Sequence, residues 1–529
     1  MNIKNPILPG FNPDPSIIRV GDDYYIAVST FEWFPGVQIH HSKDLVNWRL
    51  LTRPLNRTSQ LNMAGNPNSC GVWAPCLSYD NGTFYLIYTD VKTFRGEYKD
   101  AHNYMVTTDD ITGDWSEPIY MNSSGFDPSL FHDDDGRKWF VNMVWDHRKG
   151  KHPFAGILLQ EYSPEEKKLV GPIKNIFKGS KIGKVEAPHI YKHGGYYHLM
   201  TAEGGTVLRH AVTMARSKNI DGPYELDPKN PMLTSYDNPE LELQRAGHAS
   251  LVQTQKGDWY LAHLCGRRMP TRGRCPMGRE TALQKVTWDE EGWLRLVDGS
   301  NEPKVEVEGP GLPEHKWEKE PARDDFDTDK LNINFQSLRV DISDQYSLTD
   351  RPGFLRLYGG ESLSSHHKQT LLARRQQSFF YTAQAGVEFE PDTFQQMAGI
   401  VCMYDNLTFY NFHVTLDEEL GKCLDLITCH EGAFDFPLQE KIPVSSEGQI
   451  HLRARVEYDK LRFSWSEDGK NWNEVGIDFD ASTLSDEYGE GGGDAHFTGA
   501  FVGICCQDLS GRRQPADFDY FEYKEGREA

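Results

Sequence analysis

One short phrase recurs through the first part of the chain and constrains the fold more than any other feature. It appears as Asn12-Pro13-Asp14-Pro15, returns as Phe126-Asp127-Pro128, and has a variant at Glu186-Ala187-Pro188. Each copy leads into a turn rich in Gly, Asp or Asn and then an aromatic-rich strand. Five such units align on residues that recur at intervals of 53 to 61 positions, namely Pro15, Pro75, Pro128, Pro188 and Ala249.

Repeats of strands at this period are typical of a β-propeller, in which each repeat forms one four-stranded blade. An irregular sandwich with chance similarity between hairpins would not keep so regular a spacing. The 529 residues exceed one ordinary domain. We therefore predict an all-β protein: a five-bladed β-propeller (1–300), a charged, proline-rich linker (301–323) and a jelly-roll-like β-sandwich (324–529).

Composition limits the partners. The formal net charge of −22 disfavours nucleic acid and anionic membranes, which are polyanions. No run approaches about 18 apolar residues, and the N-terminal residues lack the basic and apolar regions of a secretory signal. The nine cysteines are scattered without a CxxC pair, which favours reduced thiols. We expect a cytoplasmic protein with no nucleic-acid or membrane partner.

Equivalent positions at the start of each blade converge on the axis of a propeller. On the alignment above, these positions are Asp14, Ala74, Asp127, Ala187 and His248. The positions one residue earlier are Pro13, Trp73, Phe126, Glu186 and Gly247. Three carboxylates thus face one place, together with aromatic rings that suit the apolar face of a sugar.

Such a collection suits the cleavage of an acetal, which needs one carboxylic acid and one carboxylate. A single Asp-Pro would be only a strand-entry turn, but three matched carboxylates in a closed ring favour chemistry. His248 is either a packed histidine beneath the site or a ligand of water or a hydrated cation. Arg279 is either a surface charge or a group that holds hydroxyls and carboxylates in place. Motifs for phosphate, zinc-protease, serine-hydrolase and dinucleotide chemistry are missing from the sequence.

At these residues the chain resembles the family 43 glycoside hydrolases, and among them the two-domain β-xylosidases. The resemblance covers essentially the whole chain, in order. It is carried by Asn12-Pro13-Asp14-Pro15-Ser16, Gly71-Val72-Trp73-Ala74-Pro75, Gly125-Phe126-Asp127-Pro128-Ser129, Val185-Glu186-Ala187-Pro188-His189, Gly247-His248-Ala249-Ser250, Gly278-Arg279-Glu280-Thr281 and Phe497-Thr498-Gly499-Ala500-Phe501-Val502-Gly503.

The resemblance implies an inverting, exo-acting hydrolase. Asp14 would be the general base and Glu186 the general acid. Asp127 would orient Glu186 and keep its pKa high through the proximity of like charges. Inversion needs room for a water, so we expect the carboxyls of Asp14 and Glu186 to lie roughly 6.5–9.5 Å apart.

The remaining roles that the resemblance implies concern binding. Phe31 and Trp73 would wall the sugar pocket, and Arg279 would contact hydroxyls or the acidic groups. A loop of the sandwich would close one side through Phe497, with Phe501 as the alternative. No cofactor is required for the chemistry, but His248 matches a position that in the family binds water or a structural or activating divalent cation such as calcium.

The predicted activity is the release of xylose from the non-reducing end of short β-1,4-xylo-oligosaccharides. An α-L-arabinofuranosidase, or an enzyme with both activities, is the alternative. A non-catalytic carbohydrate-binding propeller would show the loss of one of the three carboxylates, and none is lost. We also expect a homo-oligomer, either a dimer or a tetramer.

Overall fold

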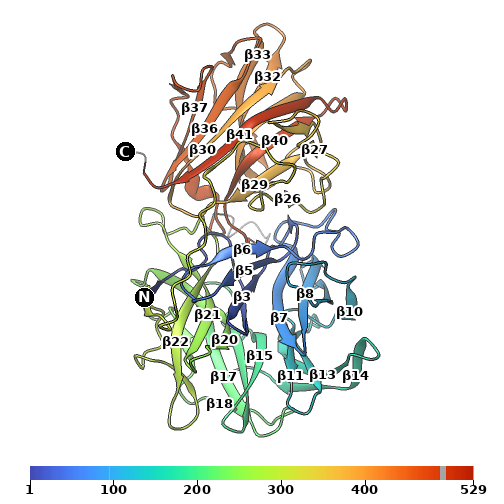
Figure 1. Ribbon diagram of the computed structural model, residues 1–529, viewed down its shortest axis with the longest axis vertical. Coiled ribbons are helices and arrows are strands. Elements are labelled where there is room, and N and C mark those ends of the chain that lie inside the picture. Colours follow the sequence, from blue (N-terminus) through green and yellow to red (C-terminus); the bar gives the residue numbers. More distant parts are fainter. Residues whose placement is uncertain (95, 489–495, 528–529) are drawn as a thin grey trace.

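The computed structural model describes residues 1–94, 96–488 and 496–527. Its regular structure in these ranges is strand, apart from one 3₁₀ turn, η1 (Ala481–Thr483). Two bodies are stacked along the long axis, the N-terminal one blue to green and the C-terminal one orange to red (Figure 1). The all-β prediction is confirmed. Within the described residues no helix is long and apolar enough to cross a membrane.

Five antiparallel sheets, counted over the described residues, form the N-terminal body and confirm the five-bladed propeller. In each sheet the strands follow one another in chain order from the axis outward. The blades are β2 (Ser16–Val20), β3 (Asp23–Val28), β5 (Gln38–Ser42) and β6 (Arg49–Thr52); β7 (Gly71–Asp80), β8 (Thr83–Thr93), β9 (Asp100–Thr108) and β10 (Ile119–Asn122); β11 (Ser129–His132), β12 (Lys138–Trp145), β13 (Phe154–Ser163) and β14 (Lys168–Phe177); β15 (Glu186–His193), β16 (Tyr196–Glu203), β17 (Ala211–Ser217) and β18 (Glu225–Leu226); and β20 (Leu243–Gln253), β21 (Trp259–Arg267), β22 (Glu280–Trp288) and β23 (Leu294–Leu296). A short strand, β19 (Leu233–Thr234), also pairs with β17.

Buried hydrogen bonds from side chains of the inner strands join neighbouring blades, with donor–acceptor distances of 2.5–3.4 Å. They link Ser16 to Leu77, Ser129 to Pro188, Tyr191 to Leu251, and Ser250 to both Pro15 and Ile17. Because each of these hydroxyls reaches the backbone of the next blade, it satisfies polar groups that would otherwise be buried without partners. A hydrogen bond of 2.9 Å between Ser78 Oγ and His132 Nε2 links the second and third blades. The inner strands are therefore held as one ring, with the last blade tied directly to the first.

A two-stranded clasp adds to the closure of the ring. β1 (Asn2–Lys4) pairs with β24 (Glu306–Glu308), which lies inside the predicted linker. The Asn5 side chain donates to the carbonyl oxygens of Leu283 and Lys304 at 2.8 Å each. The N-terminal residues are thus fastened to the last blade and to the start of the linker.

The C-terminal body is a sandwich of two antiparallel sheets, nine-stranded and seven-stranded as counted over the described part of the chain, which confirms the predicted β-sandwich. A shared apolar core lies between them. The nine strands are β27 (Tyr346–Ser347), β28 (Leu355–Tyr358), β41 (Pro515–Glu525), β30 (Phe380–Phe389), β36 (Ile450–Glu457), β37 (Lys460–Ser466), β38 (Asn473–Glu474), β25 (Arg323–Asp324) and β39 (Phe479–Asp480). The seven are β29 (Leu371–Arg375), β40 (Phe501–Asp508), β31 (Gln396–Asp405), β32 (Thr408–Asp417), β33 (Gly421–His430), β34 (Ala433–Asp435) and β35 (Ile442–Pro443).

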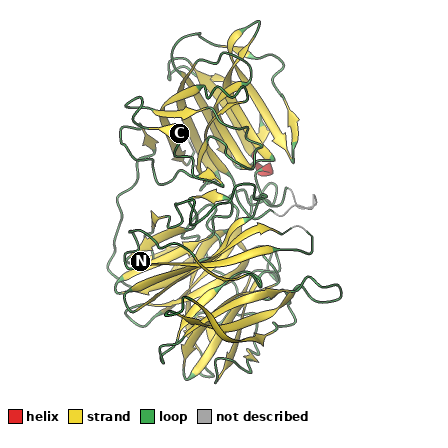
Figure 2. Cartoon of the chain, turned by 90° about the vertical axis from the view of Figure 1, so that its right-hand side faces the viewer, coloured by secondary structure: helices red, strands yellow, loops and turns green. Residues whose placement is uncertain are grey.

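The two bodies share one continuous apolar cluster. β4 (Trp33–Phe34) of the first blade pairs with β26 (Ser337–Leu338). The ring of Trp33 stacks on that of Phe501, with centroids 3.6 Å apart and planes 12° from parallel. η1, red in Figure 2, lies at the same junction, where Ser482 accepts a hydrogen bond from Arg274. The sandwich therefore packs closely on the propeller.

Candidate active site

A pocket of about 380 Å³ lies at the end of the propeller axis that faces the sandwich. Its walls come from all five blades and from the loop ahead of β40. Every predicted site residue lines it: Asp14, Phe31, Trp73, Asp127, Glu186, His248, Arg279 and Phe497. Phe501 is fully buried against Trp33 instead.

The same backbone break occurs in every blade where the chain reaches the axis. The five aligned residues all have positive φ: Asp14 57°, Ala74 38°, Asp127 55°, Ala187 51° and His248 42°. Residues other than glycine rarely adopt this left-handed backbone conformation, because their Cβ atom comes too close to the carbonyl oxygen. In three blades the ladder with the second strand shifts its register at this residue. Bulges of this kind often direct side chains toward functional sites. Because the blades are repeats, the five left-handed residues occupy equivalent positions.

The break lets each blade present either the left-handed residue or the one before it. The first and last blades present Asp14 and His248, which are themselves left-handed. The second and fourth present Trp73 and Glu186, which precede left-handed alanines. The third presents both Phe126 and Asp127. The carboxylates therefore approach the pocket from three separate blades.

The surroundings of Asp14 favour its ionised form. Ser29 Oγ donates to Asp14 Oδ2 at 2.6 Å, and Arg279 Nη1 and His248 Nδ1 each lie 3.4 Å from Oδ1. Burial alone would raise the pKa of Asp14, but the positive charge of Arg279, the neighbouring His248 and the Ser29 hydrogen bond together lower it below its ordinary value. A carboxylate held in this form suits a general base.

The pKa values of Glu186 and Asp127 shift in the opposite direction. Burial is the largest cause for Glu186, followed by the negative charge of Asp14, and its pKa rises to about 8. Burial, then Glu186 and then Asp14, raise the pKa of Asp127 well above its ordinary value, although Asp127 Oδ2 accepts a hydrogen bond from Ala187 N at 3.2 Å. The largest cause at Glu186 is thus the exclusion of water, with charge repulsion second. A carboxyl that keeps its proton at neutral pH suits a general acid.

Aromatic rings form one continuous wall. The centroid of Trp73 lies 5.8 Å from that of Phe31, 5.7 Å from Phe497, 5.6 Å from Phe94 and 5.5 Å from Phe126. Contacts at these distances and tilts stabilise packed rings. The wall therefore combines residues from the first three blades with one from the sandwich, and it offers apolar faces to a sugar ring.

Arg279 connects the acidic floor to the sandwich loop. Its side chain is buried, with 4% of its surface exposed. Besides Asp14, its guanidinium donates to Thr206 Oγ1 at 3.0 Å and to the carbonyl oxygen of Phe497 at 2.8 Å. It also lies over the rings of Phe31 and Phe497. Burial at this place shows that Arg279 is not a surface charge.

A cation at His248 would find few protein ligands. Among the described residues, no three His, Cys, Asp or Glu side chains gather as a ligand set. Calcium takes about six to eight oxygen ligands, so water would supply most of them here. The divalent cation at His248 stays a prediction.

Several lining residues were not predicted from the sequence. They are Phe94, Lys99, Trp145, Phe154, Lys184, Gly205, Thr206, Val207 and His210. Except for Lys184, they lie at or within the connections between the second and third strands of the second, third and fourth blades. This connection lies at the same end of a blade as the entry to its first strand. The strand order of a propeller blade is therefore a signal that could have identified these loops as pocket-forming, although not which of their side chains face inward.

Known proteins resemble the chain over both bodies. Residues 3–294 match the model of glycosyl hydrolases family 43, and residues 323–524 match the beta xylosidase C-terminal concanavalin A-like domain. A "Beta-xylosidase" of Bacillus subtilis (strain 168) is 54% identical over 99% of this chain and 100% of its own length. A "Xylosidase/arabinosidase 43B" of Humicola insolens is 48% identical over 99% of this chain and 97% of its own length. The crystal structure of a xylan beta-1,4-xylosidase from Bacillus halodurans C-125 superposes with a TM-score of 0.96 at 58% identity, covering 99% of this chain and 100% of that one.

Proposed function

Because the chain belongs to glycosyl hydrolase family 43, we propose that this enzyme is an inverting, exo-acting β-xylosidase. It releases single xylose units from the non-reducing end of short β-1,4-xylo-oligosaccharides. The observation that carries this proposal is the divergence of two carboxyls in one pocket: the pKa of Asp14 is lowered, while that of Glu186 is raised to about 8. At neutral pH the pocket thus holds one base and one acid, as hydrolysis by inversion requires.

In the proposed reaction Glu186 donates its proton to the glycosidic oxygen as the bond to the anomeric carbon breaks. Asp14 takes a proton from the attacking water, and the product sugar has the opposite anomeric configuration. Asp127 is the proposed positioning residue for Glu186. No hydrogen bond from the described residues reaches the Glu186 carboxyl, which leaves it available to the substrate. The 6.5–9.5 Å spacing of the two carboxyls, roughly what inversion needs, stays a prediction.

Exo-action is supported by the shape of the site. All five blades and Phe497 of the sandwich wall the pocket, so a chain end fits it better than the middle of a polymer. The pocket would take the terminal sugar against Trp73 and Phe31, with Arg279 near its hydroxyls. Among the relatives, a protein whose name includes both xylosidase and arabinosidase supports α-L-arabinofuranosidase as a second activity.

Product analysis on xylotriose tests the proposal. We expect xylose and xylobiose as the first products, and NMR during the first turnovers should show xylose released as the α-anomer. Release of xylobiose units from longer oligomers would contradict exo-action on single sugars, and a β-anomer would contradict inversion. Measured rates on nitrophenyl β-xyloside and nitrophenyl α-arabinofuranoside will show the relative strength of the xylosidase and arabinofuranosidase activities.

Three further expectations belong to the proposal. The chemistry needs no cofactor, so activity should survive dialysis against EDTA. If a cation bound through His248 supports activity, dialysis should instead lower the activity and added calcium should restore it. The protein is expected to act in the cytoplasm on imported oligosaccharides. It is expected to form a dimer or tetramer, which light scattering after gel filtration would measure.

A further inference from the structure

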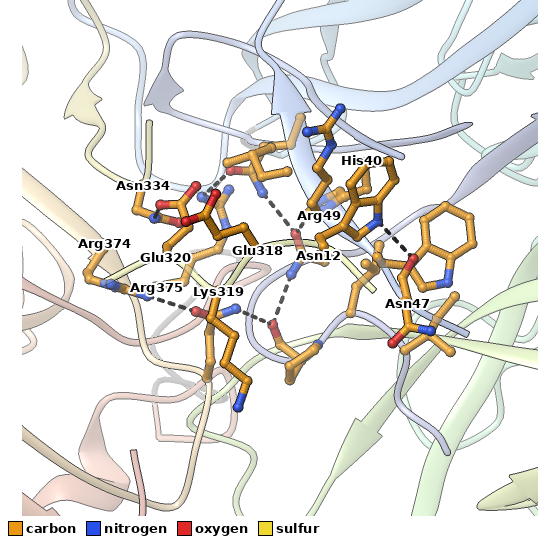
Figure 3. Close-up of a pocket in the computed structure, with 18 of the residues that line it drawn as sticks. Asn12, His40, Asn47, Arg49, Glu318, Lys319, Glu320, Asn334, Arg374 and Arg375 are labelled. Carbon is orange, nitrogen blue, oxygen red and sulfur yellow. Dashed lines mark hydrogen bonds between the residues drawn. The ribbon is translucent and has the colours of Figure 1, made fainter. Parts of the chain in front are cut away.

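A second and larger pocket, of about 620 Å³, lies between the propeller and the sandwich. Its walls come from residues 7–12, strands β5 and β6 with their connection, the linker residues 316–320, and the end of β29. No residue lines both this pocket and the active-site pocket. Figure 3 shows the linker residues Glu318 and Lys319 between the Arg374–Arg375 pair on one side and Asn12 and His40 on the other.

This interdomain pocket is basic in an acidic protein. Six of its lining residues carry a positive charge, namely Arg49, Arg53, Lys316, Lys319, Arg374 and Arg375, and two are carboxylates, namely Glu318 and Glu320. The chain as a whole has a formal net charge of −22. His40 adds no charge, because burial and then the nearby arginines lower its pKa to about 3. The local excess of positive charge therefore needs a physical explanation.

Two of these arginines are buried without a counter-ion. Arg53 is 7% exposed and Arg375 is 5% exposed, and neither forms an ion pair within the described residues. Both donate to the same neutral acceptor, Gln38 Oε1, from Arg53 Nη2 at 2.6 Å and from Arg375 Nη1 at 2.9 Å. Arg375 Nε donates to the carbonyl oxygen of Phe11 at 2.6 Å. Arg53 Nε also donates to Gln38 Oε1, at 3.1 Å. Three guanidinium nitrogens thus share this one amide oxygen.

Most other donors of these arginines bond to neutral oxygens, such as Arg53 Nη1 to the carbonyl oxygen of Phe335, but two buried donors lack a partner in the described part of the chain. Arg375 Nη2 and Arg374 Nε have no hydrogen-bond acceptor among the described residues. A buried donor left without a partner costs about 1–3 kcal/mol, and more when it is charged. Burial lowers the pKa of Arg53 to about 9, and burial followed by the charge of Arg53 lowers that of Arg375 well below its usual range. Both observations describe positive groups without the negative charge that would stabilise them.

We propose that the interdomain pocket binds a small organic anion whose carboxylate or phosphate pairs with the guanidinium groups of Arg374 and Arg375, which line the pocket. A planar guanidinium is the preferred partner of both oxyanions. The volume of the pocket exceeds that of a bare oxyanion, so the ligand carries an organic body that lies against Trp48 and the linker. This site is separate from sugar hydrolysis, and its ligand need not be a substrate.

The test measures thermal unfolding and calorimetric binding of the full-length protein with three ligands that share one ring. D-glucuronate carries a carboxylate, D-glucose 6-phosphate carries a phosphate, and D-glucose is the neutral control. We expect at least one anion to raise Tm by about 2–4 °C at 100-fold excess over Kd, and glucose to leave it unchanged. The anion that gives the shift identifies the preferred oxyanion. Equal shifts with the anions and with glucose, or no shift with either anion, would overturn the proposal.

Variants distinguish this pocket from the active-site pocket, which also contains lysines. Arg374 is the half-buried member of the Arg374–Arg375 pair. Arg374→Gln should raise Kd for the anion about 10- to 100-fold. Arg375→Gln should abolish binding, and if it does not fold, Arg374→Gln alone decides. The control Arg19→Gln removes an exposed arginine on β2 and should bind as the wild type does. An unchanged Kd in Arg374→Gln would place the anion elsewhere and refute the site.

Discussion

Asp14 and Glu186 carry the same functional group in one pocket, yet their surroundings shift their pKa values apart. Asp14 is buried and Glu186 is half-buried, and the loss of water pushes both pKa values up. Asp14 also has Arg279, His248 and Ser29 beside it, and their combined effect outweighs burial. Glu186 has mainly the negative charge of Asp14, which adds to burial. The difference between acid and base is thus made by the residues that surround each carboxyl.

This divergence predicts a bell-shaped pH profile for kcat/KM on xylobiose. Activity needs Glu186 protonated, so it should fall as the pH rises through about 8. It needs Asp14 ionised, so activity should fall at acidic pH only when the pH drops below the ordinary Asp pKa of 3.8.

Glu186→Gln should lower the rate on xylobiose about 10²- to 10⁴-fold and affect dinitrophenyl xyloside less, since that leaving group needs little protonation. The exposed control Glu225→Gln should behave as the wild type, and an alkaline limb unchanged in Glu186→Gln would contradict the assignment.

A second prediction concerns Ser29, whose hydroxyl donates to Asp14 and accepts from Ala74 N at 2.7 Å. Ser29→Ala removes one of the groups that lower the pKa of Asp14. The acid limb of kcat/KM should therefore move to higher pH, and stability should fall by about 1–3 kcal/mol because the buried N–H of Ala74 loses its acceptor. The matched control is Ser16→Ala, since the buried Ser16 also joins the first two blades but does not contact Asp14. A similar shift of the acid limb in both variants would refute the role of Ser29.

At the level of elements, the inner strands explain what the sequence could predict. The repeat located Asp14, Asp127 and His248, because equivalent positions of a closed ring must converge. It did not reveal that these residues are left-handed, since no glycine marks the positions. It also left Phe94 and Trp145 unpredicted. Their direction depends on how connections from neighbouring blades pack, which strand patterns do not encode.

The choice between Phe497 and Phe501 was likewise open from the sequence. Three residues separate them, and both lie ahead of or at the start of β40. Phe501 stacks on Trp33 and is fully buried, whereas Phe497 lines the pocket. The partner that settles this lies in the first blade, far away in the chain. Similarly, the resemblance implied that Asp127 keeps the pKa of Glu186 high, whereas burial is the largest cause and the charge of Asp14 the second.

The loop that precedes β22 makes a third prediction possible. Gly278 has φ +64°, and a Cβ there would lie 2.1 Å from the carbonyl oxygen of Thr498. Gly278→Ala should push the sandwich loop, with Phe497, away from Arg279 and lower kcat/KM up to about 10²-fold, since small displacements of positioning groups carry such costs. Gly273→Ala is the control, because Gly273 has φ +69° in the same loop but open space around it. Equal losses in the two variants would show that backbone strain, rather than the contact with Thr498, is responsible.

At the level of the whole molecule, the stability of the two bodies is shared at their junction. Phe501 and Trp33 stack there, and both are fully buried. Phe501→Ala should lower the free energy of unfolding by about 3–5 kcal/mol through lost apolar burial and a cavity. Phe434→Ala removes a ring that is 54% exposed on the sandwich and should change stability by less than about 0.5 kcal/mol. Denaturant unfolding measures both, and a loss near zero for Phe501→Ala would mean that the junction contributes little.

The residues that form the active-site pocket are synthesised at different times during translation. In the order of synthesis Asp14 comes first, Arg279 follows 265 residues later and Phe497 a further 218 residues after that. The ring that holds Asp14 in place closes only after the strand with Ser250 has been made, because Ser250 accepts from Ile17 and donates to Pro15. A chain still being translated therefore has its base long before it has a pocket. The pocket wall is complete only after Phe497 of the sandwich has been made.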